Sequence, residues 1–198
     1  MILEKIICNF LMTNCYFFGD DKTNEIIIID PGGEELAIER RIKNRKYNPV
    51  GIVFTHGHPD HTIAGKYLKD KFKIPVYFHP NEKKLIPIED FIPIKEPESI
   101  KIGNQELFVL DTPGHTSGGI CLVSYQNKII FTGDTLFRGS IGRTDLGNGN
   151  FYNLVNSIKN KIIRNEKINK NFIIYPGHDE ESTINFEIEY NIFRKDFL

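Results

Sequence analysis

One short segment constrains this chain more than any other. Residues 55–61 read Thr-His-Gly-His-Pro-Asp-His, which brings three histidines and an aspartate together. Two more histidines, His115 and His178, each follow a Pro-Gly pair downstream. Imidazole and carboxylate groups at such spacings are typical of metal ligands, whereas a histidine-rich surface turn would not require the two later Pro-Gly-His segments. The pattern therefore predicts a metal centre.

Each candidate ligand stands just beyond an apolar, β-branched or aromatic run that predicts a buried strand. The pairs are residues 51–54 before His56, 106–110 before His115, 129–133 before Asp134 and 172–175 before His178. In layered α/β proteins the loops at one edge of a sheet meet in a common crevice. Ligands that are far apart in the chain can therefore converge in space.

Other segments complete the predicted architecture. Residues 34–46 begin with two glutamates and end with basic residues, an order that complements a helix dipole. Apolar residues three and four apart predict helices at 63–68 and 151–162. The prolines and charged residues of the segment 79–99 indicate an irregular surface connection. Three amino-terminal strands are predicted at residues 2–8, 14–18 and 25–30.

Composition argues against several classes of protein. The chain has 198 residues with a net charge of -1, so neither nucleic acid nor an anionic membrane is an expected partner. No apolar run approaches the length of about 18 residues that a membrane span needs, and a cytoplasmic, unanchored protein is expected. We expect one domain over residues 1–198. Three cysteines without metal-binding spacing are expected to be core thiols: Cys8, Cys15 and Cys121.

Five motifs are spread along the chain, together with the loop of residues 138–145. They are Asp-Pro-Gly-Gly at 30–33, His-X-His-X-Asp-His at 56–61, Pro-Gly-His-Thr at 113–116, Gly-Asp-Thr-Leu-Phe at 133–137 and Pro-Gly-His at 176–178. In this order they resemble the metallo-β-lactamase superfamily, and within it the compact glyoxalase II-like (hydroxyacylglutathione hydrolase-like) proteins. The resemblance implies an α/β fold, the αββα sandwich, with two facing mixed β-sheets flanked by helices.

The resemblance also implies two divalent metal ions. Zinc is the expected metal, with iron and manganese as alternatives. The implied ligands are His56, His58 and His115 for one ion, Asp60, His61 and His178 for the other, and Asp134 between the two. Asp60 has a second possible role, since it could orient the nucleophile or accept its proton. Asp30 and Thr55 are expected to hold the motif loops without contacting substrate.

The implied activity is hydrolysis of a small-molecule thioester, of the S-lactoylglutathione type, by a hydroxide that bridges the two ions. One alternative is a persulfide dioxygenase, an oxidoreductase with a single iron held by His56, His115 and Asp134. Another is a metal-binding protein without turnover. The main zinc class of secreted β-lactamases carries cysteine at the position of Asp134 and a signal peptide, so hydrolysis of antibiotics is not expected.

The substrate contacts and the oligomeric state remain open in the sequence. Only twenty residues follow His178, whereas glyoxalase II proper has a carboxy-terminal helical domain that binds glutathione. Arg138 and Arg143 could pair with a substrate carboxylate or brace their own loop through internal salt bridges. Asp179 replaces the glycine that the compact family members usually have. His79, the one histidine outside the motifs, is interpreted as a partly exposed residue at the end of a strand.

Overall fold

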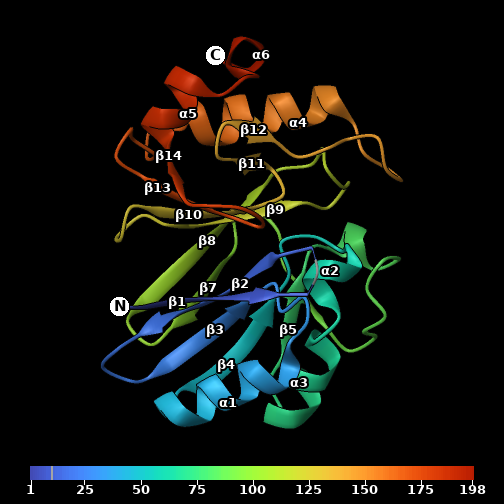
Figure 1. The fold of residues 1–198 in the computed structure, drawn as a ribbon, viewed down its shortest axis with the longest axis vertical. Helices are drawn as coiled ribbons and strands as arrows, with labels where there is room; N and C mark the ends of the chain where they lie inside the picture. The colour runs from blue at the N-terminus through green and yellow to red at the C-terminus, as the bar shows by residue number, and fades with distance from the viewer. Residues whose placement is uncertain (10) are drawn as a thin grey trace.

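The protein is described here by a computed structural model that covers residues 1–9 and 11–198. Two six-stranded sheets lie in the middle of the molecule, with helices α1 and α3 on one outer side and α4, α5 and α6 on the other (Figure 1). This order of layers, together with mixed pairing in both sheets, confirms the predicted αββα sandwich.

The amino-terminal sheet starts as an antiparallel meander and continues with parallel strands. β1 pairs antiparallel with β2 and β2 with β3, after which β4, β5 and β6 are added in parallel. Parallel neighbours need a long crossover, which α1 supplies between β3 and β4. The strands are β1 (Ile2–Cys8), β2 (Thr13–Asp20), β3 (Glu25–Ile29), β4 (Asn48–Val53), β5 (Val76–Phe78) and β6 (Ile92–Pro93).

The carboxy-terminal sheet has the order β14-β13-β10-β9-β8-β7, and its one parallel pair is β10 with β13. A separate two-stranded hairpin, β11 with β12, follows β10 directly. The strands are β7 (Ser99–Ile102), β8 (Gln105–Asp111), β9 (Ile120–Ser124), β10 (Ile129–Gly133), β11 (Leu136–Phe137), β12 (Ser140–Ile141), β13 (Ile173–Pro176) and β14 (Ser182–Thr183).

Helices cover the outer faces of both sheets. The helix predicted at 34–46 is α1, while the one predicted at 151–162 continues from α4 into a π-helical segment, η2. Within the described residues no helix combines the length and apolar character needed to cross a membrane. The helices are α1 (Glu35–Arg45), α2 (Pro59–Thr62), α3 (Gly65–Phe72), the 3-10 turn η1 (Pro80–Glu82), α4 (Phe151–Ser157), η2 (Ile158–Ile163), α5 (Ile184–Tyr190) and α6 (Arg194–Phe197).

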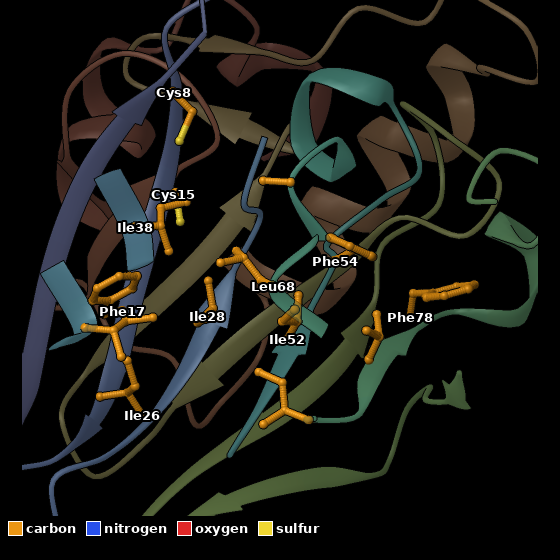
Figure 2. Packing of buried hydrophobic residues seen from close by; sticks show 14 of the residues in the cluster. Cys8, Cys15, Phe17, Ile26, Ile28, Ile38, Ile52, Phe54, Leu68 and Phe78 are labelled. Atoms are coloured by element: carbon orange, nitrogen blue, oxygen red, sulfur yellow. The ribbon is translucent and has the colours of Figure 1, made fainter. Parts of the chain in front are cut away.

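β2 is buried along its whole length because side chains pack on both of its faces. Successive side chains of a strand point to opposite faces, so Phe17 packs under α1 and α3 whereas Phe18 packs between the two sheets. Phe18 meets Phe131 of the opposite sheet edge-on, with ring centroids 5.8 Å apart. Figure 2 shows part of the cluster beneath the helices. The expected core thiols are confirmed, because all three cysteines are buried.

The interpretation of residues 79–99 as a surface connection was wrong in part. Glu82 is fully buried, and Ile86 and Ile94 are nearly so. The segment also forms η1 and adds β6 to the edge of the amino-terminal sheet. It turns inward because the Glu82 carboxylate accepts hydrogen bonds from backbone groups of two other loops. Two of the prolines lie inside regular structure, Pro80 at the start of η1 and Pro93 in β6.

Glu39 on α1 yields a test of how the helix layer is fixed. Its carboxylate accepts hydrogen bonds from Lys43 and Tyr67 and pairs with Lys71, which lowers the pKa of Glu39 from 4.5 to about 2. A lowered folded-state pKa stabilises the fold above the unfolded pKa, and this contribution is lost as the pH falls from 4.5 toward about 2.

We predict that Glu39→Gln lowers the free energy of unfolding at neutral pH and that its difference from the wild type shrinks as the pH falls below 4.5. Urea unfolding at several pH values measures this. Glu35→Gln, on the same helix but outside this network, is the control. A difference that stays constant with pH would contradict the assigned ionic role.

Candidate metal centre

The seven candidate ligands meet at one end of the sandwich. His56 follows β4, His115 follows β8, Asp134 follows β10 and His178 follows β13, as the strand pattern predicted. Asp60 and His61 lie on α2, which Pro59 begins, so the second half of the histidine segment is itself helical. The helix expected around residues 63–68 accordingly starts later, at Gly65. Both sheets therefore contribute to the cluster.

Three imidazoles form the first group of possible ligands. His56 Nε2 lies 3.1 Å from His58 Nδ1, and His115 Nε2 lies 2.9 Å from the same atom. His115 Nδ1 donates to the carbonyl oxygen of Arg143 at 2.7 Å, so its Nε2 presents a lone pair to the other rings. Tetrahedral zinc with Zn–N bonds of about 2.0–2.1 Å places nitrogens about 3.3 Å apart. The separations fit one shared cation.

Asp60, His61 and His178 form the second group. His61 Nε2 and His178 Nε2 are 3.2 Å apart, and Asp60 Oδ2 lies 3.6 Å and 3.4 Å from them. The Nδ1 atoms of both rings face away from the cluster and already have partners. His61 Nδ1 faces Asp30, and His178 Nδ1 donates to the carbonyl oxygen of Leu11 at 3.1 Å. Both Nε2 atoms are thereby directed inward.

Asp134 lies between the two groups. Its Oδ1 is 3.3 Å from His61 Nε2, and its Oδ2 is 3.4 Å from His115 Nε2. Burial alone would raise the pKa of Asp134, but His61 and the neighbouring imidazoles outweigh it and hold this pKa far below its usual value. Oδ1 is buried and has no hydrogen-bond partner among the described residues. A buried, ionised oxygen of this kind fits a bound cation.

A buried carboxylate outside the ligand set fixes the geometry. Asp30, at the end of β3, accepts the Thr55 backbone N–H at 2.7 Å and the Thr55 hydroxyl at 2.6 Å, and its Oδ2 lies 3.0 Å from His61 Nδ1. Asp30 is close enough to His56 and His61 to count as a possible ligand. We exclude it, because both oxygens are occupied and it faces the outer nitrogen of His61. This is the supporting role expected for Asp30 and Thr55.

The sequence did not reveal Glu82 as a further supporting residue. Its Oε2 accepts the Gly57 N–H at 2.7 Å and its Oε1 accepts the Gly118 N–H at 2.6 Å. Glu82 therefore joins the loop of His56 and His58 to the loop that follows His115. No local pattern separates Glu82 from the charged residues around it, so sequence reasoning had no signal with which to find it.

Glycine is required where the last ligand loop passes Asp134. A Cβ on Gly177 would collide with Asp134 Oδ1 and with the His61 ring. The loop is held by Tyr16, whose hydroxyl donates to the Pro176 carbonyl at 2.7 Å. His178 is thus positioned by a residue of the opposite sheet.

A pocket of about 670 Å³ opens over the cluster. Arg143 lines it, but its guanidinium makes two hydrogen bonds of 2.8 Å to Asp145. Arg138 donates to the Glu181 carbonyl at 3.1 Å and lies over Phe186, 4.6 Å from the ring centroid. Both arginines therefore brace their own surroundings, which was one of the two roles left open. Asp179 lines the same pocket, with a left-handed backbone at φ 64°.

His79 lies outside the cluster, as expected. It follows β5, is partly exposed, and its Nδ1 accepts the Asn81 N–H at 3.2 Å, which caps η1. Its Nε2 points toward Asp111, 4.0 Å from Oδ1.

Comparisons with known proteins agree with this geometry. A family model described as the metallo-beta-lactamase superfamily matches residues 8–178. Hydroxyacylglutathione hydrolase GloC of Haemophilus influenzae is 33% identical, over 98% of each chain. The solved structure of the BLEG-1 B3 metallo-beta-lactamase is similar with a TM-score of 0.90 and 31% identity, over 98% of this chain and 99% of that one. TTHA1623 in a di-iron-bound form has a TM-score of 0.86 and 26% identity, over 96% and 99%.

Glu82 gives a test of this loop arrangement. In Glu82→Gln one backbone N–H loses its acceptor and faces an amide donor instead. The lost hydrogen bond to a charged group should lower the free energy of unfolding by about 1.5–3 kcal/mol. We predict a lower melting temperature and weaker retention of metal in a chelator titration. Glu89→Gln, an exposed position in the same segment, should match the wild type in both. Equal behaviour of the two variants would rule out the assigned role of Glu82.

Proposed function

The chain belongs to the metallo-beta-lactamase superfamily, and we propose that it is a dinuclear metal-dependent hydrolase that cleaves small thioesters of the S-lactoylglutathione type. The observation that carries the proposal is the placement of Asp134 between two groups of inward-facing ligand atoms. The similarity to hydroxyacylglutathione hydrolase GloC over 98% of both chains supports the choice of a thioester.

In this proposal the two groups are two metal sites. Ions held there would supply a hydroxide nucleophile near neutral pH and polarise the substrate carbonyl. Imidazole and carboxylate ligands without cysteine suit zinc, iron and manganese, and we propose zinc. The proposed ligands are His56, His58 and His115 for the first ion, Asp60, His61 and His178 for the second, and Asp134 for both.

Asp60 is proposed chiefly as a ligand. Burial raises its pKa, but the hydrogen bond with His178 and the charge of His61 outweigh this and leave the pKa lowered. The ionised carboxylate is the form that binds a metal ion. The Thr13 hydroxyl donates to Asp60 Oδ2 at 3.2 Å, and the Asn9 amide donates to its carbonyl oxygen at 3.0 Å. These bonds hold Asp60 facing the pocket.

The surrounding residues support a substrate site at the same place. The pocket lies directly over His58, His115 and His178, so a bound carbonyl group would reach both groups of ligands. The Asp30 carboxylate keeps His61 in the tautomer whose Nε2 faces Asp134. These contacts preorganise the centre before substrate arrives.

One prediction of the proposed function concerns metal content. Protein purified without added metal should contain about two ions per chain by elemental analysis, and His58→Ala and Asp134→Ala should each lower that content. His79→Ala, which removes a histidine outside the cluster, is the matched control and should keep full content. Equal loss of metal in the His79 variant would overturn the ligand assignment.

Another prediction of the proposed function concerns the reaction itself. Metal-loaded protein should hydrolyse S-lactoylglutathione and a simple acetyl thioester, and Asp134→Ala should lower kcat/KM by about 10²-fold or more. A β-lactam assayed in parallel tests the activity named for BLEG-1. One iron per chain, no thioester cleavage, and oxygen uptake with glutathione persulfide would assign the protein to the dioxygenase class instead.

A further inference from the structure

The pocket over the candidate metal centre has apolar walls. Leu11 and Leu146 stand on its rim and keep 50% and 45% of their surface exposed. Phe137 and Ile141 of the β11–β12 hairpin line the deeper part, where the Phe137 ring lies edge-on to His178 with centroids 6.1 Å apart. Large apolar side chains beside polar ligands are the usual composition of a small-molecule site.

The apolar rim is tied to the ligand histidines. The Leu11 carbonyl accepts the His178 Nδ1 hydrogen at 3.1 Å, so the backbone of Leu11 is fixed by the same ring that faces the centre. The Arg143 carbonyl accepts from His115 Nδ1 at 2.7 Å, and the loop that follows carries Leu146. Both leucines therefore belong to loops anchored to candidate ligand histidines, and both line the pocket over the cluster.

The described walls of the same pocket carry one basic side chain besides the histidines, and that side chain is already paired with a carboxylate. Among the described residues that line it, Arg143 is the single basic side chain apart from the histidines, and both its hydrogen bonds go to Asp145. Asp179 adds a carboxylate to the lining. A substrate carboxylate would compete with Asp145 for Arg143 and would lie near the Asp179 carboxylate, so it gains less from this pocket than an apolar group does.

We infer that this site selects thioesters with an apolar, uncharged arm next to the scissile bond. The reaction named here rests on the proposed function, but the selectivity belongs to the pocket and can be measured by binding alone. Because glutathione carries carboxylates, the inference ranks neutral thiol carriers above glutathione for the same acyl group. Within the proposed thioester class, substrates with apolar acyl or alkyl arms are therefore expected to bind more tightly than those with charged arms.

Non-hydrolysable thioethers test the inference without turnover. Calorimetry on the metal-loaded protein would compare the S-ethyl, S-butyl and S-hexyl thioethers of N-acetylcysteamine. A fully buried methylene improves binding about 4-fold, and a half-open rim should give about 2-fold. The S-hexyl compound has four more methylenes than the S-ethyl compound and should therefore bind about 16-fold more tightly. Its S-(5-carboxypentyl) counterpart should lose most of that gain.

Two variants locate the effect. Leu146→Asn should reduce the ratio of the S-ethyl to the S-hexyl dissociation constant toward 1, because the rim then gains a polar side chain. Leu36→Asn changes a leucine of similar exposure, 59%, on α1 outside the pocket and should keep the wild-type ratio. A dissociation constant that is independent of chain length, or tighter binding of the carboxylate compound, would overturn the inference.

The binding test of the apolar selectivity can succeed or fail independently of the hydrolysis test of the proposed function. Chain-length dependence in binding without hydrolysis of any thioester would support the apolar site and refute the thioesterase proposal. Hydrolysis of S-lactoylglutathione with no chain-length dependence in binding would support the proposed function and refute the apolar selectivity. Both measurements use the same protein preparation.

Discussion

The candidate centre depends on one buried carboxylate. Asp30 binds the backbone and the hydroxyl of Thr55, which begins the histidine segment, and also faces His61 on α2. It thereby fixes the ends of β3 and β4 relative to each other and sets which nitrogen of His61 faces Asp134. A buried carboxylate is tolerated only when its hydrogen bonds are satisfied, and here the satisfying groups are parts of the site. The contacts that hold this corner of the fold therefore also position the ligands.

The two sheets are joined through the site as well as through the core. The Ile120 N–H of the carboxy-terminal sheet donates to the Thr55 carbonyl of the other loop region at 2.8 Å, and Tyr16 reaches across to the Pro176 carbonyl. Glu82 adds a third tie between the loops of His56 and His115. The first group of imidazoles therefore depends on contacts between segments that are distant in the chain. These ties hold the ring nitrogens of His56, His58 and His115 at separations that one cation could share.

The superfamily accommodates different reactions on one fold, since GloC and BLEG-1 are both similar to this chain over nearly its whole length. The groups that would hold the metal ions cannot by themselves distinguish such substrates, because they act on the reacting carbonyl. Discrimination has to come from the walls of the pocket. Here those walls are apolar, and the arginine that lines them is paired with Asp145. The substrate proposals therefore depend on the residues of the pocket walls and not on the candidate metal ligands.

Local sequence patterns predicted the convergence of the ligands, because apolar runs marked β4, β8, β10 and β13 and a candidate ligand follows each of them within a few residues. The layers of the sandwich were predicted from the resemblance of the motifs to the superfamily. The sequence patterns did not predict β9, although that strand is buried throughout. The Arg143–Asp145 pair joins residues two positions apart, and such a salt bridge was one of the roles that the sequence left open for Arg143. The role of Glu82 was decided by tertiary structure alone, because its two backbone partners are distant in the chain. Whether a charged side chain is buried, paired or free depends on which distant backbone groups reach it, and no local pattern records that.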